Sequence, residues 1–120
     1  MIKIVIVRDG GGSVQSFNVK GHAGYDAEGR DIICAAASAV AYTVAGYFEE
    51  KYNRDGLPGK SCFKAKSGDF YWKRPRITDE KEKIAADAVL EAATVGFRQI
   101  EYSYGKKYLV VSEEEVQPNA

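Results

Sequence analysis

A run of apolar residues from Ile32 to about Tyr52 is the feature that most constrains the fold of this chain. The run has the length of a helix, and its apolar side chains recur at helical spacing along one stripe. The stripe consists of Ile33, Ala37, Val40, Ala41, Val44 and Phe48. Asp31, directly before the run, is a favourable N-cap residue and makes Cys34 the third residue of the helix. We therefore expect one long helix whose first turn carries a cysteine.

The segment before this helix reads as a β-hairpin. Ile2–Arg8 is β-branched and nearly all apolar, as is typical of a strand covered on both faces. Asp9–Ser13 is rich in glycine, which supplies the positive φ that a tight turn needs. Val14–Gly21 then alternates apolar and polar residues and predicts the return strand. The hairpin places His22 just beyond a strand end.

The second half of the chain shows the same order of hairpin and helix. Residues 60–66 and 69–73 flank the turn Ser67-Gly68 and predict a second hairpin. An acidic turn after Thr78 predicts a second helix that continues to about Tyr104. The apolar positions of this helix are Ile84, Ala88, Ala92, Val95 and Phe97.

The expected elements follow in the order strand, strand, helix, strand, strand, helix, strand. Lys107–Ser112 supplies the last strand, so residues 1–112 form a single domain and residues 113–120 a solvated tail. This order predicts an α+β fold, with two long helices on one face of a mainly antiparallel sheet of about five strands. The other face needs cover or a partner. Because the first helix is rich in alanine, a second copy can approach it closely, and we expect a homodimer.

The composition narrows the classes of function. The chain has 120 residues, of which 45% are hydrophobic, enough for one core but too few for two. Seventeen basic and seventeen acidic side chains cancel, so we expect neither direct nucleic-acid binding nor attraction to an anionic membrane. We expect no segment to reach the roughly 20 apolar residues that cross a bilayer. These features predict a soluble, cytoplasmic protein.

The cysteine and histidine content argues against a disulfide and a metal site. Cys34 and Cys62 could form one disulfide, but the absence of an export signal favours free thiols in a reducing compartment. A structural zinc site needs about four Cys or His ligands, and the chain has two cysteines and one histidine. We therefore expect no metal and no cofactor.

His22 and Cys34 are the candidates for chemistry. The single histidine precedes the cysteine by twelve positions. A thiolate at a helix start beside an imidazole lies in two electric fields that favour the anion. The amides of the helix N-terminus can also donate to an oxyanion. Because free cysteine is among the most buried residue types, simple packing of Cys34 is the alternative. The pattern indicates a thiol nucleophile with its base, as acyl-transfer chemistry requires.

The residues around this pair closely resemble the signature of a known family. Gly21-His22-Ala23, followed by the run from Asp31 to Ser38, is similar to the motif of the bacterial ribosomal-processing cysteine proteases, abbreviated Prp. The resemblance covers nearly the whole chain and implies a cytoplasmic homodimer without a cofactor. It implies that Cys34 is the nucleophile and His22 the general base. It also implies the substrate, the N-terminal extension of a large-subunit ribosomal protein, which is cut after paired aromatic residues.

Three further residues of this motif have roles that stay open. Gly21 precedes the histidine, and the resemblance places it in a supporting or substrate-binding set. Asp31 could orient His22 or only cap the helix. Ser38 follows Cys34 by one helical turn, where its hydroxyl could meet the thiol or bond back to a helix carbonyl.

The segment between the histidine and the cysteine reads as an exposed, mobile loop. Ala23–Arg30 contains Gly24 and Gly29 among several polar residues. The distance from Cys34 to His22 can therefore exceed hydrogen-bond reach in the absence of peptide and shorten when peptide binds.

The second hairpin carries basic and aromatic residues that allow several interpretations. They are Lys60, Lys64, Lys66, Lys73, Arg74, Arg76, Phe63, Phe70, Tyr71 and Trp72. Contact with nucleic acid is one interpretation, and an ordinary amphipathic hairpin with Phe70 and Trp72 inward is another. A third is that exposed aromatic rings hold the aromatic pair of the substrate. Tyr42 and Tyr47 are expected in the core or at a dimer contact. The alternative function is a non-catalytic ribosome-assembly or RNA-binding factor.

Overall fold

The computed structural model describes residues 1–27, 30–52 and 62–116, and its elements follow the expected order. The elements are β1 (Ile2–Arg8), β2 (Val14–Lys20), α1 (Ile32–Tyr52), β3 (Phe63–Lys66), β4 (Asp69–Lys73), α2 (Glu80–Tyr104) and β5 (Leu109–Glu115). Gly29, Lys60 and the last residues of the expected tail lie outside the described residues.

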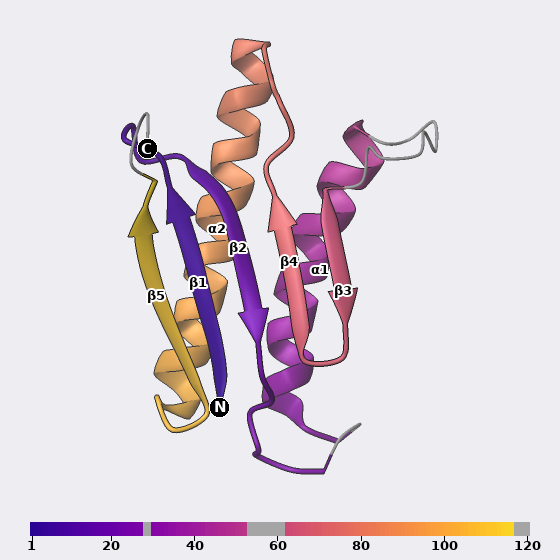
Figure 1. The fold of residues 1–120 in the computed structure, drawn as a ribbon, viewed down its shortest axis with the longest axis vertical. Helices are drawn as coiled ribbons and strands as arrows, with labels where there is room; N and C mark the ends of the chain where they lie inside the picture. Colours follow the sequence, from indigo (N-terminus) through magenta and orange to yellow (C-terminus); the bar gives the residue numbers. More distant parts are fainter. Residues whose placement is uncertain (28–29, 53–61, 117–120) are drawn as a thin grey trace.

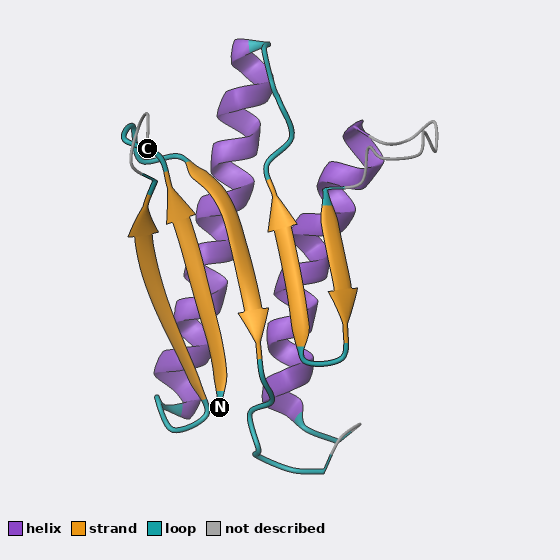
Figure 2. Ribbon diagram, viewed as in Figure 1, coloured by secondary structure: helices purple, strands orange, loops and turns teal. Residues whose placement is uncertain are grey.

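The strands form one sheet in the order β3-β4-β2-β1-β5 (Figures 1 and 2). The pairs β1–β2, β2–β4 and β3–β4 are antiparallel, and β1–β5 is parallel. Both helices lie on the same face, with α1 behind β3 and β4 and α2 behind β1 and β5. The predicted α+β class and the mainly antiparallel sheet are therefore confirmed.

The expectation that β1 is covered on both faces is wrong. Ile2, Ile4 and Ile6 face the helices and are buried, whereas Lys3 on the opposite face is exposed. Val5 shares that open face and is only half-buried. The strand is therefore buried on the face toward the helices, and no second layer of the described residues covers its other face.

Aromatic side chains fill the core between the sheet and the helices. Phe17 of β2 stacks on Phe70 and Trp72 of β4, with ring centroids 5.8 and 5.5 Å apart. Phe97 of α2 meets Phe17 edge to face at 5.5 Å. Phe48 of α1 lies 4.8 Å from Trp72, so both helices converge on the same aromatic cluster. Phe70 and Trp72 point inward, as in the interpretation of the second hairpin as an ordinary amphipathic one.

Helix α1 departs from the expectation that no segment could span a bilayer. By length and composition alone its 21 residues suffice, and an 18-residue window of the helix has a mean hydropathy of 1.4. A core helix of a globular protein passes the same test, and every residue of the stripe from Ile33 to Phe48 except the half-buried Val40 is buried in the core. The apolar character of α1 is explained by this stripe together with the alanines on its remaining sides.

Helix α2 has the expected range but buries a different face. Its buried residues are Ala86, Leu90, Thr94, Phe97 and Ile100. Of the expected stripe only Phe97 is buried, while Ile84 and Val95 are 68% and 55% exposed. The buried face is hard to recognise in the sequence because it contains a polar residue, Thr94. Thr94 can be buried because its hydroxyl donates a hydrogen bond to the Leu90 carbonyl at 2.9 Å.

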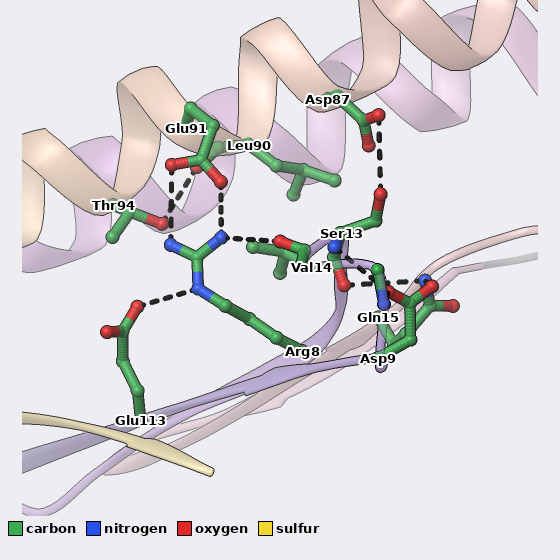
Figure 3. A network of polar contacts seen from close by, with 12 residues as sticks. Arg8, Asp9, Ser13, Val14, Gln15, Asp87, Leu90, Glu91, Thr94 and Glu113 are labelled. Carbon is green, nitrogen blue, oxygen red and sulfur yellow. Dashed lines mark hydrogen bonds and ion pairs between the residues drawn. The ribbon is translucent and has the colours of Figure 1, made fainter. Parts of the chain in front are cut away.

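The last strand is longer than expected, and Glu113–Glu115 do not belong to a tail. These residues pair with Ile6, Val7 and Arg8 of β1. Arg8 Nε donates to Glu113 at 2.8 Å, and its guanidinium also bonds Glu91 of α2 (Figure 3). The hydrogen bond from Arg8 lowers the pKa of Glu113. The side chain of Glu113, which looks solvated in the sequence, is therefore held by a basic side chain from the neighbouring strand.

Candidate active site

Three parts of the chain meet at one end of the sheet: the end of β2, the turn from β3 to β4, and the start of α1 (Figure 1). A cavity of about 430 Å³ lies among them. It is lined by Gly21, His22, Asp31, Cys34 and Ser38, together with the turn residues 65–70. The structure thus brings together all five residues that the sequence singled out.

The segment Gly21-His22-Ala23 is fixed by its backbone at three points. The Gly21 N–H donates to the Gly68 carbonyl at 2.9 Å. The His22 carbonyl accepts from the ammonium group of Met1 at 2.7 Å. The Ala23 N–H donates to the sulfur of Cys34 at 3.4 Å. Gly21 has a φ of 96°, and a Cβ atom there would overlap the Met1 carbonyl oxygen, so only glycine fits.

Asp31 is a buried carboxylate whose oxygens accept only backbone amides among the described contacts. Oδ1 accepts from Ile33 and Cys34, each at 3.0 Å, which caps α1. Oδ2 accepts from Tyr25 at 2.9 Å and Asp26 at 3.3 Å, which ties the preceding loop to the helix. Burial opposes ionisation, but these four hydrogen bonds outweigh it and hold the pKa of Asp31 below its usual value. The capping role is confirmed; a role in orienting His22 is not supported by any hydrogen bond.

Cys34 is a half-buried free thiol in the first turn of α1. In the described part of the chain no hydrogen bond joins it to His22, and the donor that faces its sulfur is the Ala23 amide. The amides of Ile33 and Cys34 are already bound to Asp31. The helix cap therefore occupies two of the amides that are expected to be open to an oxyanion.

Ser38 and Tyr42 follow Cys34 along the cavity side of α1. No hydrogen bond of the Ser38 hydroxyl is found among the described residues, so neither of its two suggested contacts is present. Tyr42 is half exposed rather than in the core, and its ring meets Phe70 edge to face at 5.2 Å. Sequence reasoning missed Tyr42 as a cavity residue because it lies between two buried positions of the helix.

The basic residues of the second hairpin separate into two groups. Lys64, Lys66 and Lys73 are exposed. Arg74 instead forms an ion pair with Asp87 of α2 at 2.9 Å and is part of the structure. Among the described residues there is no group of three or more His, Cys, Asp or Glu that could hold a metal ion.

Known proteins are similar to this chain in sequence. The family model described as "Cysteine protease Prp" matches residues 1–109. A relative from Bacillus subtilis (strain 168), the ribosomal processing cysteine protease Prp, is 27% identical over 104 residues, 87% of this chain and 90% of the relative.

Solved structures share the fold. The ribosomal processing protease Prp from S. aureus, with a covalently linked product peptide, superposes with a TM-score of 0.74 at 23% identity, covering 95% of this chain and all of the other. SMU.848 from Streptococcus mutans superposes with a TM-score of 0.70 at 20% identity, covering 97% and 96%. Because the family model spans nearly the entire sequence, the chain belongs to the Prp family of cysteine proteases.

Proposed function

We propose that this protein is an endopeptidase in which Cys34 is the nucleophile and His22 the general base. Its substrate is the N-terminal extension of a large-subunit ribosomal protein. The observation that carries the proposal is the placement of both side chains on one cavity, with the Ala23 amide directed at the sulfur. The name of the B. subtilis relative and the peptides bound to S. aureus Prp support the class of substrate.

The reaction uses the residues of the cavity in two steps. His22 takes the proton of the Cys34 thiol, and the sulfur attacks the scissile carbonyl carbon. The carbon–nitrogen bond then breaks as His22 returns the proton to the leaving amine, and a thioester forms. Water hydrolyses the thioester with His22 as base, which restores the thiol. The Ala23 N–H stabilises the anionic sulfur before attack.

The walls of the cavity support a preference for aromatic side chains at the cut. Tyr42 and Phe70 both line the cavity, and Phe63 stacks on Phe70 with centroids 5.7 Å apart. Aromatic rings favour edge-to-face and offset contacts with further rings. A peptide whose extension ends in two aromatic residues would find such partners in the cavity that Cys34 also lines.

Cleavage of a matched pair of peptides tests the proposal. One peptide ends its extension in two aromatic residues and the other in two alanines. The wild type and Cys62→Ala, whose cysteine does not line the cavity, should cut the aromatic peptide after the pair. Cys34→Ala should lose activity by ~10³-fold or more. Comparable cleavage by Cys34→Ala would overturn the assignment.

We also propose that the protein acts in the cytoplasm as a homodimer. On the outer side of α1, Ala35, Ala39 and Gly46 are exposed and small, which lets the helix of a second copy approach closely. Light scattering at micromolar concentration should give the mass of two chains. A monomer mass would contradict the proposal.

A second candidate function is attachment to a ribosomal particle without catalysis. Lys64 and Lys73 lie on the open face of the sheet with Tyr71, which is 41% exposed. Positive charges beside an exposed aromatic ring favour the binding of single-stranded RNA. Cys34→Ser distinguishes the two functions. A binding factor keeps its affinity for the ribosomal particle in that variant, whereas a protease loses cleavage of the peptide.

A further inference from the structure

We propose that Gly68, in the turn between β3 and β4, is a positioning residue that sets the orientation of the His22 imidazole. In other nucleophile–base pairs a third side chain orients the base. Here the turn takes that place. The catalytic part of this inference rests on the proposed function, whereas the contact itself does not.

The imidazole of His22 packs on the bare Cα of Gly68. A Cβ atom on Gly68 would lie 2.7 Å from Nε2, 3.3 Å from Cε1 and 3.4 Å from Cδ2 of His22. These three atoms are Nε2 and the two carbon atoms bonded to it. A separation of 2.7 Å is one that real Cβ atoms essentially never show, so with any other residue at this position something must shift. The exposed His22 ring, at the end of a flexible side chain, is the part that moves most easily.

A backbone contact joins the same two segments. The Gly68 carbonyl accepts the Gly21 N–H at 2.9 Å, one residue before the histidine. The sheet fixes the position of the turn, because Lys20, the last residue of β2, pairs with Asp69 at the start of β4. Gly68 therefore contacts both the ring of His22 and the chain that leads into it.

No carboxylate orients the imidazole in the described part of the chain. Both oxygens of Asp31 accept backbone amides. Asp26 and Asp69 line the cavity without a hydrogen bond to His22 among the described contacts. Because His22 is exposed, its ring would be free to change rotamer without a wall beside it. The turn supplies that wall.

Gly68→Ala tests this role, with Gly12→Ala as a matched control. Both glycines have positive φ, 71° and 90°, so alanine strains the backbone at each. Gly12 has no atom within 4 Å of its Cβ position, so its variant carries the strain alone. Because His22 is the only histidine, its imidazole signals in an NMR spectrum need no further assignment.

The expected results distinguish positioning from general damage. The wild type should show nuclear Overhauser contacts between the Gly68 α-protons and the imidazole protons. Gly68→Ala should shift the imidazole signals and lower kcat for the aromatic peptide ten- to a hundredfold with little change in KM. Gly12→Ala should leave the imidazole signals and kcat unchanged.

Two outcomes would overturn the proposal. One is the absence of the Overhauser contact in the wild type, a measurement that needs neither a variant nor activity. The other is a Gly68→Ala protein whose imidazole signals and kcat match those of Gly12→Ala. If the wild type shows the contact but cuts no peptide, the proposed function fails while the contact stands.

Discussion

The carboxylate of Asp31 organises the candidate site at the scale of single residues. It closes the N-terminus of α1 and anchors the loop that follows His22. The sequence identified Asp31 as a cap, because aspartate before an apolar helical run is a strong signal. It could not indicate the two bonds to Tyr25 and Asp26, since these depend on how the loop folds back over the helix start.

Asp31→Asn should lower the free energy of unfolding at pH 7 by about 1–2 kcal/mol. The asparagine side chain keeps one oxygen that can accept two of the four backbone N–H groups. Its NH₂ group cannot accept the other two. Since the folded state lowers the pKa of Asp31, the carboxylate stabilises the protein above its unfolded pKa of about 3.9. That contribution is lost as the pH falls through the lower, folded pKa.

Urea unfolding at pH 7 and at pH 3 checks this prediction. The difference between wild type and Asp31→Asn should shrink at the lower pH. Asp79→Asn is the control, because Asp79 caps α2 from an exposed position through one bond to the Glu82 amide. That variant should cost only a few tenths of a kcal/mol. An equal deficit for Asp31→Asn at both pH values would contradict the account.

At the scale of elements, helix α1 was predictable and the buried face of α2 was not. In α1 the apolar stripe from Ile33 to Phe48 is the stripe that packs on the sheet. In α2 apolar residues occupy two faces, and the buried face contains Thr94. Periodicity alone cannot choose between two apolar faces, because the choice depends on which one meets Phe17 and the sheet.

A pair of alanine variants checks the assignment of the faces of α2. Leu90→Ala should lower the free energy of unfolding by about 2–4 kcal/mol, since Leu90 is 1% exposed and its removal leaves a cavity. Ile84→Ala should change it by no more than about 0.5 kcal/mol, because Ile84 is largely exposed. Urea unfolding of both variants gives the comparison. A larger loss for Ile84→Ala would reverse the assignment.

At the scale of the whole molecule, the sequence predicted the order of elements but not their neighbours in space. β2 pairs with β4, and the helix α1 and the strand β3 separate the two in the sequence. This pairing brings the β3–β4 turn to the end of β2 and so places Gly68 against His22. The motif around His22 and Cys34 predicts the chemistry, whereas the proposed support from the turn depends on a non-local pairing that no local pattern encodes.

Affinity labelling tests most directly whether Cys34 attacks the N-terminal extension of the ribosomal protein. A chloromethyl ketone is made from a peptide that ends in two aromatic residues, and the labelled residue is located by mass spectrometry. The label should appear on Cys34 and form more slowly in His22→Ala. Cys62 should stay unlabelled, because burial and the nearby charge of Glu49 raise the pKa of its thiol. A label on Cys62 alone, or a rate at Cys34 that His22→Ala leaves unchanged, would contradict the account.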